Sequence, residues 1–191
     1  GAVTSSNKFA SDVGINILKD GGNAVDAAIA VGFALAVVHP GAGNIGGGGF
    51  MVIRLADGTK TTIDFRETAP QKASRDMFLD ENGDIIEGKS WSTSWASGVP
   101  GSVAGFGLAH EEFGTLKWSQ LIDSSIQLAR DGYSLNYNDA NSFNRYNDFL
   151  TKDSVTRTIF VRDEEFKTGD ILVQRNLAST LERISRAGWE E

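Results

Sequence analysis

The sequence contains no cysteine and only two histidines in 191 residues. Without cysteine, the chain can form no disulfide, no thiolate nucleophile and no cysteine-ligated metal site. A Ser-His-Asp triad would have to use one of the two histidines, His39 or His110. These two do not form a His-x-x-x-His pair, which argues against a metal site. We therefore expect neither a metal nor a cofactor.

Positive charge and long apolar runs are also scarce. The chain has 18 Lys and Arg against 25 Asp and Glu, for a net charge of −7, and the basic residues do not gather in a stripe. Residues 24–38 are nearly all apolar, but they are fewer than the roughly 20 needed to cross a bilayer, and they include Asp26. We expect a buried helix there, no membrane span and no nucleic-acid partner.

Hydrophobic periodicity predicts several helices but few strands. The expected helices cover residues 8–20, 24–38, 102–113, 118–130 and 138–152, with a last one around Leu177, Leu181 and Ile184. The expected strands are 50–55 and 61–65, joined by a two-residue turn at Asp57-Gly58, and two short ones at 158–161 and 171–173. Because a domain needs two packed layers around one core, this shortage predicts that residues outside the chain complete the sheet.

Residues 43–51 read Gly-Asn-Ile-Gly-Gly-Gly-Gly-Phe-Met, with four consecutive glycines between a helix pattern and a strand pattern. Residues 41–46 also match G-x-G-x-x-G, and Asp64 lies about 20 residues downstream, as in the dinucleotide fingerprint. That fingerprint follows a strand and opens a helix, which is the reverse of the order here. The glycines instead predict that another group approaches the main chain closely.

Arg66 is the candidate for direct contact with a ligand. It follows the second strand of the expected hairpin, between Asp64 and Glu67. A guanidinium group can grip a carboxylate with two parallel hydrogen bonds, and the flanking carboxylates could orient it. The alternative is a surface ion-pair cluster that contributes little, and the spacing alone favours that alternative.

Other conspicuous residues have more ordinary interpretations. His39 ends a predicted helix, where a protonated imidazole suits the negative end of the helix dipole. His110 lies beside two glutamates on what we expect to be a solvated helix face. Trp91 and Trp95 could form the lip of a binding site, but core packing or loop anchoring is the favoured role.

Several collinear segments resemble the γ-glutamyltranspeptidases, also called glutathione hydrolases. Together they are far more specific than any one alone, and the bacterial periplasmic members look most similar. The matching segments are Gly-Asn-Ala-Val-Asp-Ala-Ala at 22–28, the glycine-rich 43–51, Asp-Phe-Arg-Glu-Thr-Ala-Pro at 64–70, Gly-Val-Pro-Gly-Ser-Val-Ala-Gly at 98–105 and Leu-Ala-Arg-Asp-Gly at 128–132.

The resemblance implies an α/β (α+β) fold, namely the four-layer αββα fold of the N-terminal-nucleophile hydrolases, of which only the N-terminal portion is present. Such enzymes cut themselves from one precursor into a large and a small subunit. The N-terminal Thr of the small subunit, activated by its own α-amine, attacks a γ-glutamyl amide. A glutamyl-enzyme forms, and water or an acceptor amino acid then takes the glutamyl group.

Within this family, Arg66 matches the arginine that binds the glutamyl α-carboxylate, and Glu67 is expected to support it. The nucleophilic Thr lies outside this chain, so we expect no catalytic residue within it. The resemblance makes residues 1–191 a single incomplete domain, roughly the first half of a large subunit. Its expected partners are γ-glutamyl compounds such as glutathione, the remaining large-subunit segment and the small subunit.

Further expectations follow from the same resemblance. The protein is expected to be periplasmic or secreted. No signal peptide is visible, and a start at Gly1 rather than Met is expected either if a leader was removed or if the sequence was chosen to begin there. The isolated chain should not turn over substrate, and its unpaired strand edges should favour self-association. Two alternatives stay open: a non-catalytic scaffold or assembly domain derived from the family, and a relative that acts on poly-γ-glutamate.

Overall fold

The computed structural model describes residues 1–190 and divides the chain into two compact units. The helical unit comprises Gly1–Asn44 and Ala109–Glu191, and the hairpin unit comprises Ile45–Leu108. The boundary at residues 108 and 109 falls inside one helix, α3 (Ser102–Phe113).

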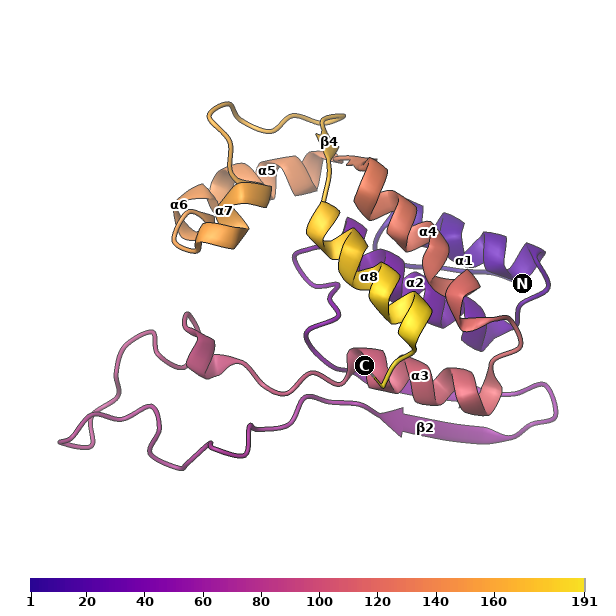
Figure 1. Cartoon of the computed structure of the whole chain (residues 1–191), viewed down its shortest axis with the longest axis horizontal. Helices are drawn as coiled ribbons and strands as arrows, with labels where there is room; N and C mark the ends of the chain where they lie inside the picture. Colours follow the sequence, from indigo (N-terminus) through magenta and orange to yellow (C-terminus); the bar gives the residue numbers. More distant parts are fainter. Residues whose placement is uncertain (191) are drawn as a thin grey trace. The chain divides into compact units, whose positions relative to one another are not determined.

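Four helices form the body of the helical unit, and Figure 1 shows them close together. These are α1 (Lys8–Lys19), α2 (Ala24–Val38), α4 (Trp118–Asp131) and α8 (Arg175–Ala187). Helix α2 packs against both α1 and α4, and α4 packs against α8. The largest fully buried apolar side chains, Phe33, Ile29, Leu121, Ile122, Leu135 and Leu181, all belong to this unit.

Helix α2 begins with a reciprocal capping box. The Asn23 side chain accepts hydrogen bonds from the backbone N–H groups of Val25 and Asp26, and Asp26 Oδ2 accepts one from the Asn23 N–H at 2.9 Å. Asp26 also accepts hydrogen bonds from the backbone N–H and the hydroxyl group of Thr115. These bonds let a fully buried carboxylate lie in the core, because each one compensates for lost hydration. The predicted buried helix is confirmed.

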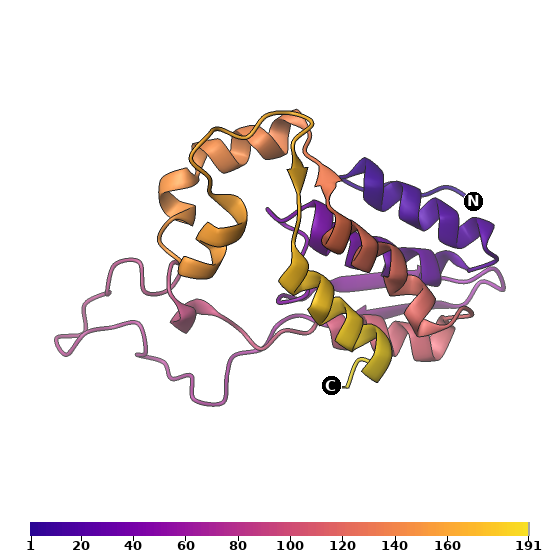
Figure 2. The ribbon, with the colours of Figure 1, turned by 45° about the horizontal axis from the view of Figure 1, so that its top comes forward.

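The rest of the helical unit holds two short strands and three short helices. Strands β3 (Tyr133–Ser134) and β4 (Ile171–Leu172) pair antiparallel, and Figure 2 shows them side by side. The expected helix at 138–152 is divided into α5 (Tyr137–Arg145) and α6 (Asn147–Leu150).

The predicted strand at 158–161 is wrong, because α7 (Ser154–Phe160) occupies most of it. Asp153 caps α7 by accepting a hydrogen bond from the Thr156 N–H, and this local bond outweighs the strand preference of the β-branched residues.

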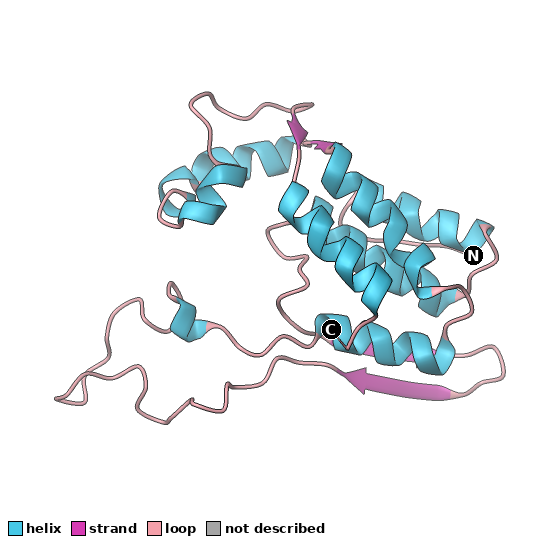
Figure 3. Ribbon diagram, viewed as in Figure 1, coloured by secondary structure: helices cyan, strands magenta, loops and turns pink. Residues whose placement is uncertain are grey.

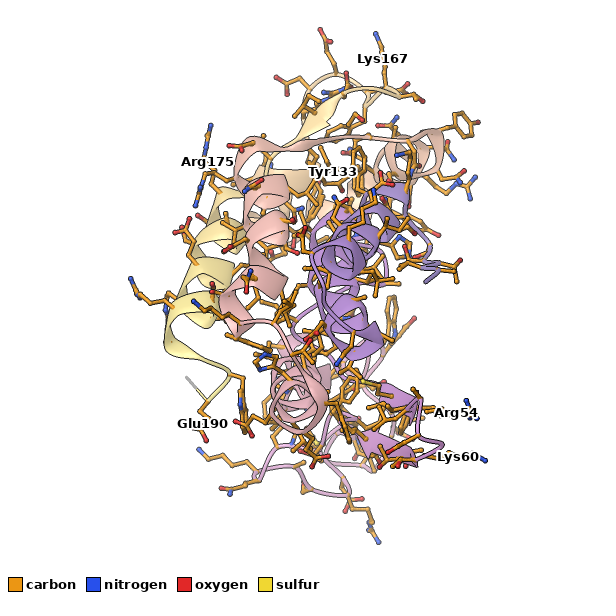
Figure 4. The ribbon with its side chains drawn as sticks, turned by 90° about the vertical axis from the view of Figure 1, so that its right-hand side faces the viewer. Arg54, Lys60, Tyr133, Lys167, Arg175 and Glu190 are labelled. Atoms are coloured by element: carbon orange, nitrogen blue, oxygen red, sulfur yellow. The ribbon has the colours of Figure 1, made fainter. Side chains whose placement is uncertain are left out.

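The hairpin unit is built on strands β1 (Phe50–Arg54) and β2 (Lys60–Asp64), which pair antiparallel from Phe50 opposite Asp64 to Arg54 opposite Lys60. Figure 4 shows Arg54 and Lys60 at the turn end of this hairpin. Within residues 1–190, each of the two strands pairs only with the other.

The hairpin is confirmed, but its turn is not the expected two-residue form. The Gly58 N–H donates to the Leu55 carbonyl, and the Leu55 N–H donates to the Thr59 carbonyl. Only Gly58 has a positive φ, at 93°, whereas a two-residue type I′ turn would also need one at Asp57. The turn is therefore a three-residue loop that closes on a left-handed glycine.

A long irregular segment follows β2 and leads to α3 (Figure 3), as the polar sequence predicts. It contains a single turn of 3₁₀-helix, η1 (Ser94–Ala96), and a bridge between Thr68 and Val99. Among residues 1–190, the helices are too short or too polar to cross a lipid bilayer.

Candidate substrate-binding site

Arg66 lies two residues beyond β2, in the exposed segment that leaves the hairpin. Its backbone N–H donates a hydrogen bond to Asp64 Oδ1 at 3.0 Å. This bond ties the Arg66 backbone to the last residue of β2. The Arg66 side chain is 63% exposed, so its guanidinium group is accessible within the hairpin unit.

Two side chains flank the guanidinium group of Arg66. Glu67 Oε2 lies 3.2 Å from Arg66 Nε, and the Phe50 ring centroid lies 5.9 Å from Arg66 Cζ. Within the described residues, neither terminal nitrogen of the guanidinium group has a hydrogen-bond partner. Because Glu67 pairs with the inner nitrogen, the two outer nitrogens form an open fork that suits a ligand carboxylate.

The glycine-rich run packs against the segment that carries Arg66. The Gly49 N–H donates to the Phe65 carbonyl at 3.3 Å, and the Phe65 N–H donates back at 3.0 Å, which extends the hairpin ladder by one pair. A Cβ on Gly48 would meet the Phe65 carbonyl and would lie 2.6 Å from Glu67 Oε2. The predicted close approach is thus confirmed at Gly48 and Gly49.

None of the four glycines at 46–49 has a positive φ, so space rather than backbone conformation explains them at the close-approach positions. Gly46 is different, because a Cβ there would meet nothing within 4 Å. Three later glycines also lie close to this segment. A Cβ at Gly98 would meet Glu67, and a Cβ at Gly101 or Gly105 would meet Phe65. Bare backbone therefore surrounds residues 65–67 on several sides.

The two histidines lie in the helical unit and have structural roles. His39 is the C-terminal cap of α2, as predicted, with its N–H donating to the Leu35 carbonyl. His110 is not on a solvated face, which corrects the prediction. Its Nε2 lies 2.8 Å from the Leu116 carbonyl oxygen, and its ring packs 5.4 Å from that of Trp118.

Trp91 and Trp95 are exposed, which contradicts core packing, one of the two roles predicted for them, and leaves loop anchoring as the other. Their exposed fractions are 70% and 57%. Trp95 stacks under the Lys89 ammonium group at 4.7 Å and lines a shallow pocket of about 200 Å³ with Met77 and Pro70. The polar segment between β2 and α3 has too little apolar surface of its own to cover two indole rings.

Phe50 is the residue of this site that the sequence argument missed. The signal was the register of the hairpin: Phe50 lies directly opposite Asp64, two residues before Arg66. An aromatic residue at the start of one strand can therefore reach a side chain just beyond the end of its partner.

The fold is that of an α+β protein of the N-terminal-nucleophile hydrolase class. The model of the γ-glutamyltranspeptidase family matches residues 10–191. The chain therefore belongs to the γ-glutamyltranspeptidase family.

Relatives of known name agree with this assignment. The glutathione hydrolase proenzyme of Escherichia coli is 50% identical over 193 residues, which cover 100% of this chain and 33% of the relative. The crystal structure of Helicobacter pylori γ-glutamyltranspeptidase superposes with a TM-score of 0.95 at 46% identity, covering 98% of this chain and 54% of that chain. The transpeptidase CapD of Bacillus anthracis gives a TM-score of 0.79 at 32% identity, over 98% of this chain and 58% of that chain.

These comparisons confirm the predicted family and fold class. They also show how much of a relative this chain spans: about a third of the curated proteins and a little over half of the solved chains.

Proposed function

We propose that this chain supplies the arginine that binds the glutamyl α-carboxylate in a γ-glutamyltransferase, or glutathione hydrolase. In this proposal Arg66 grips the carboxylate through its two outer nitrogens, while Glu67 holds the inner one. The observation that carries the proposal is an exposed arginine whose two outer nitrogens are open. Its backbone N–H is bound to Asp64 and its inner nitrogen pairs with Glu67, beside the end of the hairpin. A surface ion pair alone would not need the backbone to be cleared around Glu67 by Gly48 and Gly98.

The bond-breaking chemistry is assigned to residues outside this chain. A Thr nucleophile with its own α-amine as base would attack the γ-glutamyl amide, and a glutamyl-enzyme would form. Arg66 would act before and during that step by fixing the glutamyl group, so that the amide carbon meets the nucleophile. Such positioning lowers the barrier because it removes orientational freedom before the reaction begins.

Arg66→Lys in the full-length protein tests this role. Lysine keeps the positive charge but loses the planar fork, so one charge-assisted hydrogen bond to the carboxylate is lost. We expect KM for γ-glutamyl-p-nitroanilide to rise about 10-fold or more, as such a bond contributes about 1.5–3 kcal/mol.

Arg54→Lys is the matched control, since Arg54 is an exposed arginine at the other end of the same hairpin. An unchanged KM in Arg66→Lys, with Arg54→Lys also unchanged, would remove Arg66 from the site. The isolated chain should give no turnover at all, because the nucleophile is absent from it.

The same proposal names the partners of the chain. We propose that residues 1–191 form one incomplete domain of a large subunit, completed by the remaining large-subunit segment and by the small subunit. The unpaired outer edges of β1 and β2 support this, because such edges template pairing with further strands. Without those segments the chain would self-associate, which light scattering of the isolated chain can test.

Glutathione and related γ-glutamyl compounds are the proposed substrates. The proposed location is the periplasm or the extracellular medium, which cell fractionation of the full-length protein would check.

A further inference from the structure

We propose that Phe50 is a positioning residue for Arg66, a role that rests on the proposed function of Arg66. The Phe50 ring lies 5.9 Å from Arg66 Cζ, within the range over which the ring quadrupole attracts a guanidinium group. The ring is 63% exposed in the hairpin unit, although it is a large apolar side chain. Among the described residues it packs against a cation instead of entering the core.

The backbone fixes where the Phe50 ring stands. Phe50 is the first residue of β1 and pairs with Asp64, whose side chain accepts the Arg66 N–H. Strand residues alternate between two faces, and Phe50 lies on the exposed one while Ile53 and Ile63 are buried on the other. The ladder therefore holds the ring, the carboxylate and the start of the arginine segment in one register.

Phe50 and Glu67 constrain Arg66 in complementary ways. Glu67 pairs with Nε at 3.2 Å and limits rotation about the end of the side chain. The Phe50 ring attracts the guanidinium group, whose Cζ lies 5.9 Å from the ring centroid, and so limits movement of the whole group. A flexible arginine would otherwise lose side-chain entropy each time it bound a carboxylate, so a restrained one binds more tightly.

The consequence is specific to the substrate carboxylate. Loss of the ring should weaken binding of a γ-glutamyl compound by the strength of an exposed cation–π contact, which corresponds to a rise in KM of about two- to five-fold. It should not change kcat, because Phe50 touches no reacting atom in this proposal.

The sharpest test replaces Phe50 in the full-length protein by phenylalanines with one, two and three ring fluorines. Fluorine withdraws electron density from the ring face while nearly preserving its shape, so folding is kept and the attraction for the cation falls stepwise. We expect KM for γ-glutamyl-p-nitroanilide to rise with each fluorine at constant kcat. A KM that stays the same as the number of fluorines increases would overturn the proposal.

Conventional variants give a second readout. Phe50→Leu should raise KM for γ-glutamyl-p-nitroanilide, and Phe50→Tyr, which keeps the ring, should restore it. Neither variant should change KM for 4-aminobutyryl-p-nitroanilide, because this substrate lacks the α-carboxylate. Val52→Ala is the control, since Val52 lies on the same exposed face of β1. This variant should leave KM for both substrates unchanged. An equal effect of Phe50→Leu on both substrates would assign Phe50 a merely structural role.

A double-mutant cycle separates this proposal from the one on which it rests. In an Arg66→Lys background, the ring has lost the planar group it positions, so Phe50→Leu should add little to KM. If Arg66→Lys alone leaves KM unchanged, the proposed function fails. If Arg66→Lys raises KM but Phe50→Leu does not, only the role of Phe50 is refuted.

Discussion

The helical unit buries its polar anchor, Asp26, completely, whereas the hairpin unit leaves its polar centre, Arg66, exposed. In the first, hydrogen bonds from Asn23 and Thr115 satisfy the buried Asp26 carboxylate. In the second, the buried apolar side chains are few, namely Ile53, Ile63 and Phe106, and bare glycine backbone packs around residues 65–67. The difference supports the proposal that the hairpin unit presents a charged group to a ligand, whereas the helical unit buries its charged group within a packed core.

This contrast predicts that substitutions in the two units will have separable effects. Changes at Asp26 should alter the free energy of unfolding and leave KM nearly unchanged in the protein that folds. Side-chain changes at Arg66 and Glu67 should alter KM more than stability, whereas added bulk at Gly48 should alter both. Three variants test the separation, from the largest expected effect to the smallest.

Asp26→Asn should destabilise the full-length protein by about 2–3 kcal/mol, because it weakens hydrogen bonds to a charged buried acceptor. Burial opposes ionisation of Asp26, but hydrogen bonds from the Thr115 hydroxyl and from the N–H groups of Asn23, Thr115 and Leu116 outweigh it and hold its pKa below the ordinary value. Denaturant unfolding at pH 7 checks the loss.

The same lowered pKa fixes the pH dependence. Asp26 contributes its full stability above the pKa of an unfolded aspartate, about 4, and loses it as the pH falls through the lower folded value. The stability gap between the wild type and Asp26→Asn should therefore be constant near neutral pH and narrow below about pH 4. A gap that does not change with pH would contradict the assignment.

Gly48→Ala should lower the free energy of unfolding by about 1–3 kcal/mol, which is the usual cost of overpacking. The new Cβ would meet the Phe65 carbonyl, which is backbone and cannot move aside cheaply, and it would press on the Glu67 carboxylate. We expect KM for γ-glutamyl-p-nitroanilide to rise together with this loss of stability. Gly46→Ala is the matched control in the same run, because a Cβ at Gly46 meets open space.

Glu67→Gln should have the smallest effect. The side chain of Glu67 is 36% exposed, so solvent screens its ion pair with Arg66, and such a pair contributes less than about 1 kcal/mol. KM should rise only two- to four-fold, with a stronger effect at low salt than at high salt. Steady-state kinetics at two ionic strengths would show this, and a salt-independent change would indicate that Glu67 acts through packing.

The sequence was informative where local physics decides the outcome. The cap at Asn23 and Asp26, the run of apolar residues in α2 and the Asp57-Gly58 turn signal all predicted elements that the structure contains. The order helix, glycines, strand also argued against a dinucleotide-binding site at the glycines. The residue type of Arg66 and its place after a strand made it a candidate, but the spacing alone favoured a surface ion pair, and the resemblance to the family gave Arg66 its proposed role.

Other features depend on contacts between distant residues and could not be predicted in this way. Phe50 and Arg66 are 16 positions apart, and only the strand register brings them together. His110 appeared solvated because its neighbours in sequence are charged, yet the Leu116 carbonyl and Trp118 enclose it from beyond the end of its helix. Residues 158–161 favoured a strand until the cap at Asp153 decided for a helix.

The most direct test of the central claim is a crystal structure of the full-length protein with L-glutamate bound. The account predicts that both α-carboxylate oxygens lie about 2.7–2.9 Å from nitrogens of the Arg66 guanidinium group, with Glu67 and Phe50 still flanking it. Glutamate bound with its α-carboxylate on another residue, and Arg66 directed into solvent, would contradict it.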